Sequence, residues 1–172
     1  MLLLAGSGVF ASKAQTPGKT GYISIEEIAT LMPETSQIDS LVDKYRTDSI
    51  MPVYTQIIKD YQGQLVLYND SLKTTATVHQ NAAQTLAALS NQINNWEAIQ
   101  NQAMENKRSS LLRPIYAKVY AAIKAVAKEK GIAHVVNKEV YLIAPDSEDL
   151  LPFVAAKLKI VLPKDIKLGL GR

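Results

Sequence analysis

The sequence predicts an α+β fold that is mostly helical. A long antiparallel helical hairpin, forming a coiled-coil arm, is expected to project from a small body built on a three-stranded sheet. The chain has no glycine from Gln64 to Lys130 and no proline from Val53 to Arg113, so the strongest helix breakers are absent over a long stretch. Apolar residues in this stretch recur in steps of four and three, which is the seam spacing of a coiled coil. Short β-prone segments flank it on both sides.

The seam is visible on both arms of the predicted hairpin. Its positions are Tyr54, Ile58, Tyr61, Leu65, Tyr68 and Leu72 on the descending arm, and Leu86, Leu89, Ile93, Trp96, Ile99, Leu111, Ile115, Val119, Ile123 and Val126 on the returning arm. An arm of about 40 residues would reach roughly 60 Å at the helical rise per residue. Because this exceeds the width of a compact domain of this size, we expect residues 35–130 to project from the body.

Composition favours thin helix-on-helix packing over a thick core, because 47% of the residues are hydrophobic but only two are phenylalanine. The 172 residues would ordinarily make one domain, and the net charge is only +3. Thirteen basic residues lie at or after Lys107. They hint at an acidic partner or membrane surface, but solvated helix faces are the favoured interpretation. The absence of cysteine excludes disulfides, thiol catalysis and zinc–thiolate sites.

The first 14 residues predict a secretory signal peptide. A short apolar run, residues 1–10, is followed by small residues at Ser12 and Ala14, so cleavage is predicted after Ala14. No basic residue precedes the run, which we interpret as an N-terminal truncation caused by a start codon placed too far downstream. The alternative is a buried N-terminal helix; a membrane span would need about twice this length. Residues 15–20 read as a polar linker.

Two segments, residues 21–34 and 131–162, are predicted to form the body. Residues 21–25 alternate like a strand, and Ser24 is placed to cap a short helix over residues 25–32 in a capping box with Glu27. Pro33 ends that helix or starts the next one. Thr35 or Ser36 is expected to cap the descending arm.

The descending arm contains two irregular points and ends in a neutral tip. Pro52 predicts a kink near Met51, the alternative being two helices in series, and Gly63 is a second soft point. The turn is expected near residues 70–81, with firm helix propensity from Ala82. No Asp, Glu, Lys or Arg occurs from residue 74 to residue 96, so the tip should be polar but uncharged.

The returning arm should end at Gly131, after basic residues in the last helical turn. Residues 133–136 and 140–143 predict two strands joined by a tight loop at residues 137–139. Asp146 or Ser147 would then cap a final helix that runs to about Ile160, and residues 163–172 are predicted to be disordered. A three-stranded sheet would have open edges, and oligomerisation through the sheets would close them.

No pattern in the sequence predicts catalysis, so we expect that the protein is not an enzyme and needs no cofactor. His79 and His134 lack a second ligand at metal-binding spacing. Phosphate-binding glycine loops and the G-x-S-x-G motif are absent from the sequence. The acidic pairs Glu26–Glu27 and Glu148–Asp149 fall at predicted helix starts, where negative charge is expected for dipole reasons.

The most conspicuous pattern is the series Tyr54, Tyr61 and Tyr68, which we expect to pack in the seam. A surface for apolar segments of another protein is instead predicted at residues outside the seam, which nothing in the hairpin obviously covers. These candidate contact residues are Val53, Ile57, Val66 and Leu67. Scattered exposed apolar residues are also ordinary, which is the competing interpretation.

Three stretches make the chain resemble the Skp/OmpH family of periplasmic chaperones. They are residues 21–34, which match the opening strand and short helix; residues 111–131, which match the returning helix; and residues 134–144, which match the closing strands. The resemblance covers nearly all of the chain after the predicted signal peptide. It implies a periplasmic homotrimer whose central body carries three helical hairpins. The implied function is an ATP-independent holdase that keeps unfolded outer-membrane proteins soluble between its arms.

Two departures from the family pattern limit what the resemblance implies. Family arms tend to be rich in Lys and Glu, with basic tips, whereas the tip here carries no charge from residue 74 to residue 96. The basic tips of the family are therefore not expected in this chain. Transient contact of the protein with a membrane surface stays an open prediction. Pro52 and Gly63 also make this arm less regular.

A competing hypothesis is an exported coiled-coil structural or adaptor protein with one fixed protein partner. Such an adaptor should show a compact apolar patch, whereas a holdase should show diffuse apolar and polar arm surfaces, and the scattered residues outside the seam favour the holdase. Nucleic-acid binding is not expected, because the basic residues alternate with core positions and no aromatic platform accompanies them.

Overall fold

The computed structural model of the chain describes residues 18–70 and 75–163. The predicted signal peptide at residues 1–14, residues 15–17 of the predicted linker and all but residue 163 of the predicted tail lie outside the described residues. So do residues 71–74 of the predicted hairpin tip.

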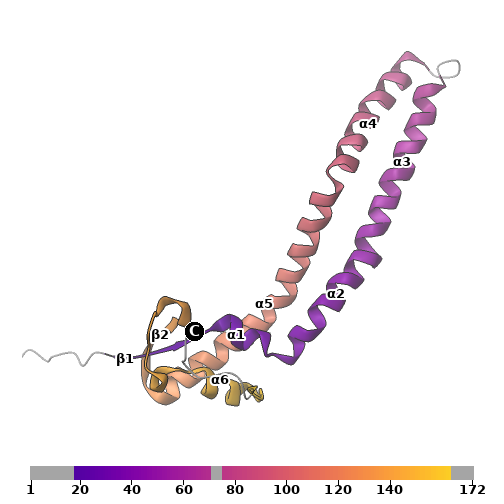
Figure 1. The fold of residues 1–172 in the computed structure, drawn as a ribbon. Helices are drawn as coiled ribbons and strands as arrows, with labels where there is room; N and C mark the ends of the chain where they lie inside the picture. The colour runs from indigo at the N-terminus through magenta and orange to yellow at the C-terminus, as the bar shows by residue number, and fades with distance from the viewer. Residues whose placement is uncertain (1–17, 71–74, 164–172) are drawn as a thin grey trace, which may run out of the picture.

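A long helical hairpin projects from a small body, as predicted (Figure 1). Its descending side consists of α2 (Ile38–Tyr45), a π-helical turn at Arg46–Ile50, and α3 (Met51–Asn69). Its returning side consists of α4 (Ala76–Asn94) and α5 (Trp96–Lys130). In the view of Figure 1, α3 and α4 lie side by side at the end farthest from the body, and they are also in contact in the structure.

The chain enters the arm through α1 (Ile25–Thr30), which begins as predicted with Ser24 as its cap: the backbone N–H of Glu27 donates to Ser24 Oγ at 3.3 Å. A 3₁₀ turn at Pro33–Gln37 then leads into α2. The prediction that Thr35 or Ser36 caps this helix is wrong. Thr35 Oγ1 donates to the Ala29 carbonyl at 2.6 Å and Ser36 Oγ donates to the Pro33 carbonyl at 2.8 Å, so both hydroxyls serve the preceding turns.

The irregularity predicted near Met51 is a π-helical turn, and the chain stays helical through it. Pro52 lies in the first turn of α3, directly after that turn. A proline has no backbone N–H to donate to the preceding turn. The wider π turn before Pro52 accommodates this missing hydrogen bond while the chain stays helical. The descending side is therefore one helical path with a local change of pitch.

The returning side is interrupted at one residue. Asn95, with φ −98° and ψ 7°, separates α4 from α5. Its own backbone N–H and side-chain amide both donate to the Asn91 carbonyl, at 3.1 and 2.8 Å, so the helical path is hardly disturbed. Pro114 lies inside α5, and Gly131 ends it in the left-handed conformation with φ 65°, as predicted.

The sheet of the described residues has two strands, so the three-stranded prediction is wrong. Strand β1 (Lys19–Ile23) pairs in parallel with β2 (Ile132–Asn137), and the arm connects them. The predicted strand at residues 140–143 does not form. A 3₁₀ turn at Lys138–Val140 leads out of β2, and Leu142 and Ile143 beyond it are 103% and 93% exposed. Their strand-like pattern is real, but none of the described residues forms a partner strand for them.

The final helix begins later than predicted, so the expected caps Asp146 and Ser147 are wrong. They lie in a separate 3₁₀ turn, Asp146–Glu148, and α6 spans Leu151–Leu158. The buried Asp149 carboxylate accepts from the backbone N–H of Leu151 at 2.8 Å. Pro152, in the first turn of α6, favours a helix start at this point.

The core lies in the body, where the end of α5 packs against α1, α6 and the sheet. Its most deeply buried large side chains are Tyr22, Ile23, Ile28, Val119, Leu150, Leu151 and Val154. The outer helices of the arm contribute little to this core, because Ala82 is the one buried residue in α3 and α4.

We expect Gly63→Ala to raise the free energy of unfolding by about 0.5–1 kcal/mol. A Cβ at Gly63, within α3, would meet no atom within 4 Å, so alanine gains helix propensity without a clash. Gly131→Ala is the matched control: its φ of 65° should make the same change destabilising by about 1–2 kcal/mol. Urea unfolding followed by circular dichroism compares them, and destabilisation by both changes would contradict the prediction.

Candidate functional site

The candidate site is the surface of the arm, which is held together by a thin aromatic seam. Tyr54 packs on Trp96 with ring centroids 4.9 Å apart, and Tyr68 stacks on His79 at 4.3 Å. Tyr61 lies half-buried between these two levels. The predicted placement in the seam is therefore confirmed for Tyr54 and Tyr68, and the partial burial of Tyr61 agrees with it. His79 packs against a ring, and His134 lies exposed on β2.

A two-helix arm leaves most of each helix in water. No residue of α3 is buried, although the structure describes this helix completely. Apolar side chains on its outer faces therefore remain exposed, since only the seam has a partner. This differs from an ordinary surface helix, whose apolar stripe is covered by a core.

The four predicted contact residues all lie on α3, on faces that the hairpin does not cover fully. Val53, Val66 and Leu67 are exposed, Val66 the most at 68%, while Ile57 is half-buried. Their role in binding another protein stays a prediction. The sequence reasoning missed further exposed apolar residues because they have seam spacing or lie on the other helix: Met51, Leu65, Tyr68, Val78 and Ile99.

The part of the arm near the body is charged, and several of its charges form ion pairs. Arg108 contacts Asp39 at 2.7 Å, and Lys118 contacts Glu34 at 2.5 Å. Lys107 lies over the ring of Tyr45, 5.2 Å from its centroid. Exposed pairs of this kind contribute little to stability, but they leave this region charged and well hydrated.

The hydrogen bond from Lys118 lowers the pKa of Glu34 below the ordinary glutamate value. A lowered pKa means that the pair stabilises the fold above the ordinary glutamate pKa and that this stabilisation is lost as the pH falls toward the lowered value. We expect Lys118→Met to return the pKa of Glu34 toward the ordinary value. A carboxyl titration by NMR measures this, with the unaltered protein as the reference. An unchanged Glu34 titration would contradict the assignment.

Within the ranges 18–70 and 75–163, no three His, Cys, Asp or Glu side chains are grouped so that they could hold a metal ion. None of the helices in these ranges is long and apolar enough to cross a membrane.

A family model of OmpH-like outer membrane proteins matches residues 19–158, which include the first body segment, the entire arm and all but the last four residues of the second body segment. The chain belongs to the OmpH-like family. No curated protein matches it. The resemblance read from the sequence is therefore confirmed at the level of the family.

The OmpH-like chain also has the fold of a crystal structure from Caulobacter crescentus CB15, assigned by its name to the OmpH-like outer membrane chaperones. The two share 15% sequence identity, with a TM-score of 0.51, over 94% of this chain and 95% of that one. At this identity the likeness shows the fold.

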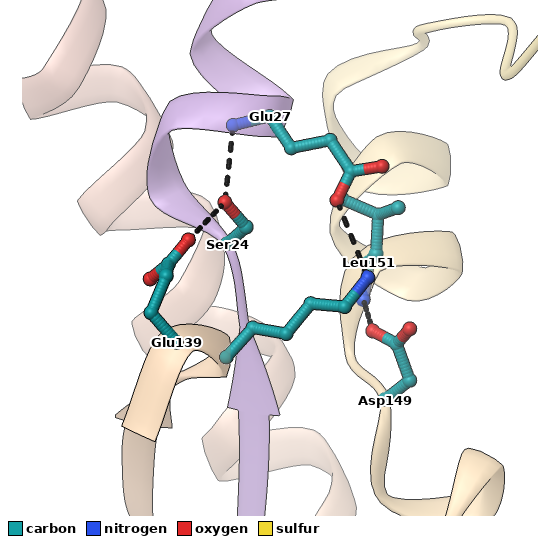
Figure 2. Close-up of polar contacts among 6 residues, drawn as sticks. Ser24, Glu27, Glu139, Asp149 and Leu151 are labelled. Atoms are coloured by element: carbon teal, nitrogen blue, oxygen red, sulfur yellow. Dashed lines mark hydrogen bonds and ion pairs between the residues drawn. The ribbon is translucent and has the colours of Figure 1, made fainter. Parts of the chain in front are cut away.

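Polar contacts in the body fix how this OmpH-like chain leaves β2. Figure 2 shows Ser24 between α1 and the corner after β2: Ser24 Oγ accepts from the N–H of Glu27 and donates to Glu139 Oε1 at 3.0 Å. The Lys138 ammonium group contacts Glu27 Oε2 at 3.6 Å. These contacts hold the 3₁₀ turn in place, and the apolar residues that follow it point away from the body's core.

Proposed function

We propose that this OmpH-like protein is an ATP-independent periplasmic holdase that binds unfolded outer-membrane proteins between helical arms and prevents their aggregation. The observation that carries the proposal is a projecting arm with exposed apolar residues, in a chain that belongs to a family of outer membrane proteins. Export through the signal peptide predicted at residues 1–14 would bring it to that compartment.

The physical task of a holdase suits such an arm. An unfolded β-barrel protein exposes apolar side chains and unpaired strand edges, and both drive aggregation. Many weak apolar contacts along a helical surface can cover these exposed groups without recognising a particular sequence. Because such contacts need no chemical step, nucleotide hydrolysis is not required.

We further propose a homotrimer assembled through the bodies. A two-stranded sheet is marginal alone. Strand β1 also bridges to Asp149, whereas within the described residues β2 pairs with β1 alone and its other edge is open. Next to it lie the exposed side chains of Leu142 and Ile143, and a groove of about 760 Å³ between α5 and β2, lined in part by the exposed Tyr120. Apolar surface of this extent beside an open sheet is typical of an interface between copies. Such an assembly would place several arms around one client.

Size-exclusion chromatography with light scattering tests both proposals. The purified protein is run alone and after mixing with a urea-unfolded outer-membrane barrel protein that has been diluted into buffer. A trimer that keeps the barrel protein soluble in a defined complex is the expected result. A trimer that lets the client aggregate would favour the adaptor with one fixed partner, and a monomer would contradict the proposed assembly.

A further inference from the structure

We infer that the outer third of the arm is an uncharged docking surface for the lipid-facing side of unfolded barrel strands, so that capture there does not depend on ionic attraction. This outer third, called the distal arm below, comprises residues 61–69 of α3 and residues 76–94 of α4. The inference rests on the proposed function and adds where on the arm a client binds and through which chemistry.

The distal arm contains no Asp, Glu, Lys or Arg. The contrast with the part of the arm near the body is sharp, because the Asp39–Arg108 pair joins α2 to α5 and Asp43 of α2 pairs with Arg46 at 3.6 Å. Between these two segments the sequence has Asp70 and Lys73, whose opposite charges add no net charge. Soluble surfaces ordinarily mix charges of both signs to prevent association, so a stretch of this length without any is unusual.

Exposed apolar residues of the arm also gather on this segment. Five of the exposed large apolar residues lie there, namely Leu65, Val66, Leu67, Tyr68 and Val78. An exposed apolar surface without charges is a liability for a protein unless a partner covers it. The two observations are independent, since one concerns charge and the other burial, and they coincide on both helices at the end of the arm far from the body (Figure 1).

The remaining side chains of the distal arm define the partner more closely. Exposed amides surround the apolar residues, among them Gln62, Asn69, Gln80, Asn81, Gln84 and Gln92. An amide both donates and accepts hydrogen bonds, so it can pair with the backbone of an extended segment without any formal charge. The partner that fits is therefore an extended chain with unpaired backbone groups and neutral, apolar side chains.

Strands of an outer-membrane barrel have this chemistry on one side. Their residues alternate, and the lipid-facing set is apolar and excludes charge near the middle of the bilayer. In the unfolded state this set lacks its membrane. A neutral apolar arm surface covers it without burying an unpaired charge, which a charged surface would do at a considerable desolvation penalty.

The first test is the salt dependence of client binding. A dye-labelled barrel protein, unfolded in urea, is diluted into the purified protein, and binding is followed by fluorescence anisotropy at about 0.05 M and about 0.5 M NaCl. Attraction between surface charges is largely screened at the higher concentration. We expect the Kd to change by less than about threefold; a loss of tenfold or more in affinity would overturn the inference, since binding would then depend on charge.

The second test locates the surface with matched variants. Leu67, in the distal arm, and Leu41, in α2, are both 42% exposed, so serine substitutions at these positions remove similar amounts of apolar surface. We expect Val66→Ser/Leu67→Ser to weaken client binding about tenfold and Leu41→Ser to leave it within about twofold. Val78→Ser tests the facing helix independently and should weaken binding about threefold.

The outcomes separate this inference from the proposed function. Circular dichroism should first show that the variants keep their helices, which is expected because the altered side chains are exposed. If the unaltered protein binds the client and the distal variants bind it equally well, the distal docking surface is wrong while the holdase proposal stands. If the unaltered protein does not bind the client at all, both are wrong.

Discussion

Leu150→Ala is expected to lower the free energy of unfolding by about 2–5 kcal/mol, the range for a buried leucine whose removal leaves a cavity. Leu150 is 1% exposed, and its backbone N–H donates to the Tyr22 carbonyl at 2.9 Å, so it ties the start of α6 to β1. Because the backbone contact holds the main chain in place, the space left by the side chain should collapse poorly. Urea unfolding at a fixed protein concentration measures the loss.

Two controls make this prediction specific. Leu41→Ala removes the same atoms from an exposed position and should change the free energy of unfolding by no more than about 0.5 kcal/mol. A Cβ added at Gly21 would lie 3.0 Å from Leu150 Cδ1, so Gly21→Ala should destabilise by about 1–3 kcal/mol. In the double variant the shortened side chain makes room for that Cβ, and the combined loss should be smaller than the sum. A strictly additive result would show that the two residues do not pack as described.

The arm was predictable because its signals are local. The absence of helix breakers, the seam spacing and the left-handed Gly131 at the end of α5 each depend only on residues that are close together in the sequence. The same locality explains the errors at helix starts. Thr35 and Ser36 have the right chemistry for a cap, but their hydroxyls found carbonyl partners in the preceding turn, a choice that depends on three-dimensional context.

The strand predicted at residues 140–143 shows the limit of periodicity. An apolar β-prone run indicates that a segment is suited to a sheet, but it does not indicate whether another strand lies close enough to pair with it. In this chain the 3₁₀ turn after β2, held by the contacts of Glu139 and Lys138, directs the run into solvent. The sequence therefore predicted the β tendency of residues 140–143 correctly but was wrong that these residues pair with another strand.

For the candidate site, the sequence predicted a neutral tip and four contact residues outside the seam. It did not predict that seam positions such as Leu65 and Tyr68 would also be exposed. The reason is geometric: two helices in contact cover one side of each seam residue, whereas a seam within a larger core is covered on all sides. How much apolar surface the arm offers thus depends on the number of helices that pack together.

The proposed trimer makes the second large prediction: Leu142→Asp/Ile143→Asp should convert the assembly into monomers. Both side chains are almost fully exposed in the single chain, so the substitutions should leave each monomer folded and helical. In an assembly closed through the bodies these residues would become buried, and two unpaired carboxylates at each interface carry a large desolvation penalty.

Light scattering after size exclusion measures the mass, and Val66→Asp is the matched control. Val66 is also an exposed aliphatic residue, but it lies on the distal arm, away from the body, so its substitution should leave the mass unchanged. The double aspartate variant should therefore lose the assembly, whereas Val66→Asp should keep the assembly but lose affinity for the client. A double aspartate variant that keeps the mass of the unaltered protein would place the interface elsewhere, because no stable contact between copies tolerates two buried unpaired charges in each chain.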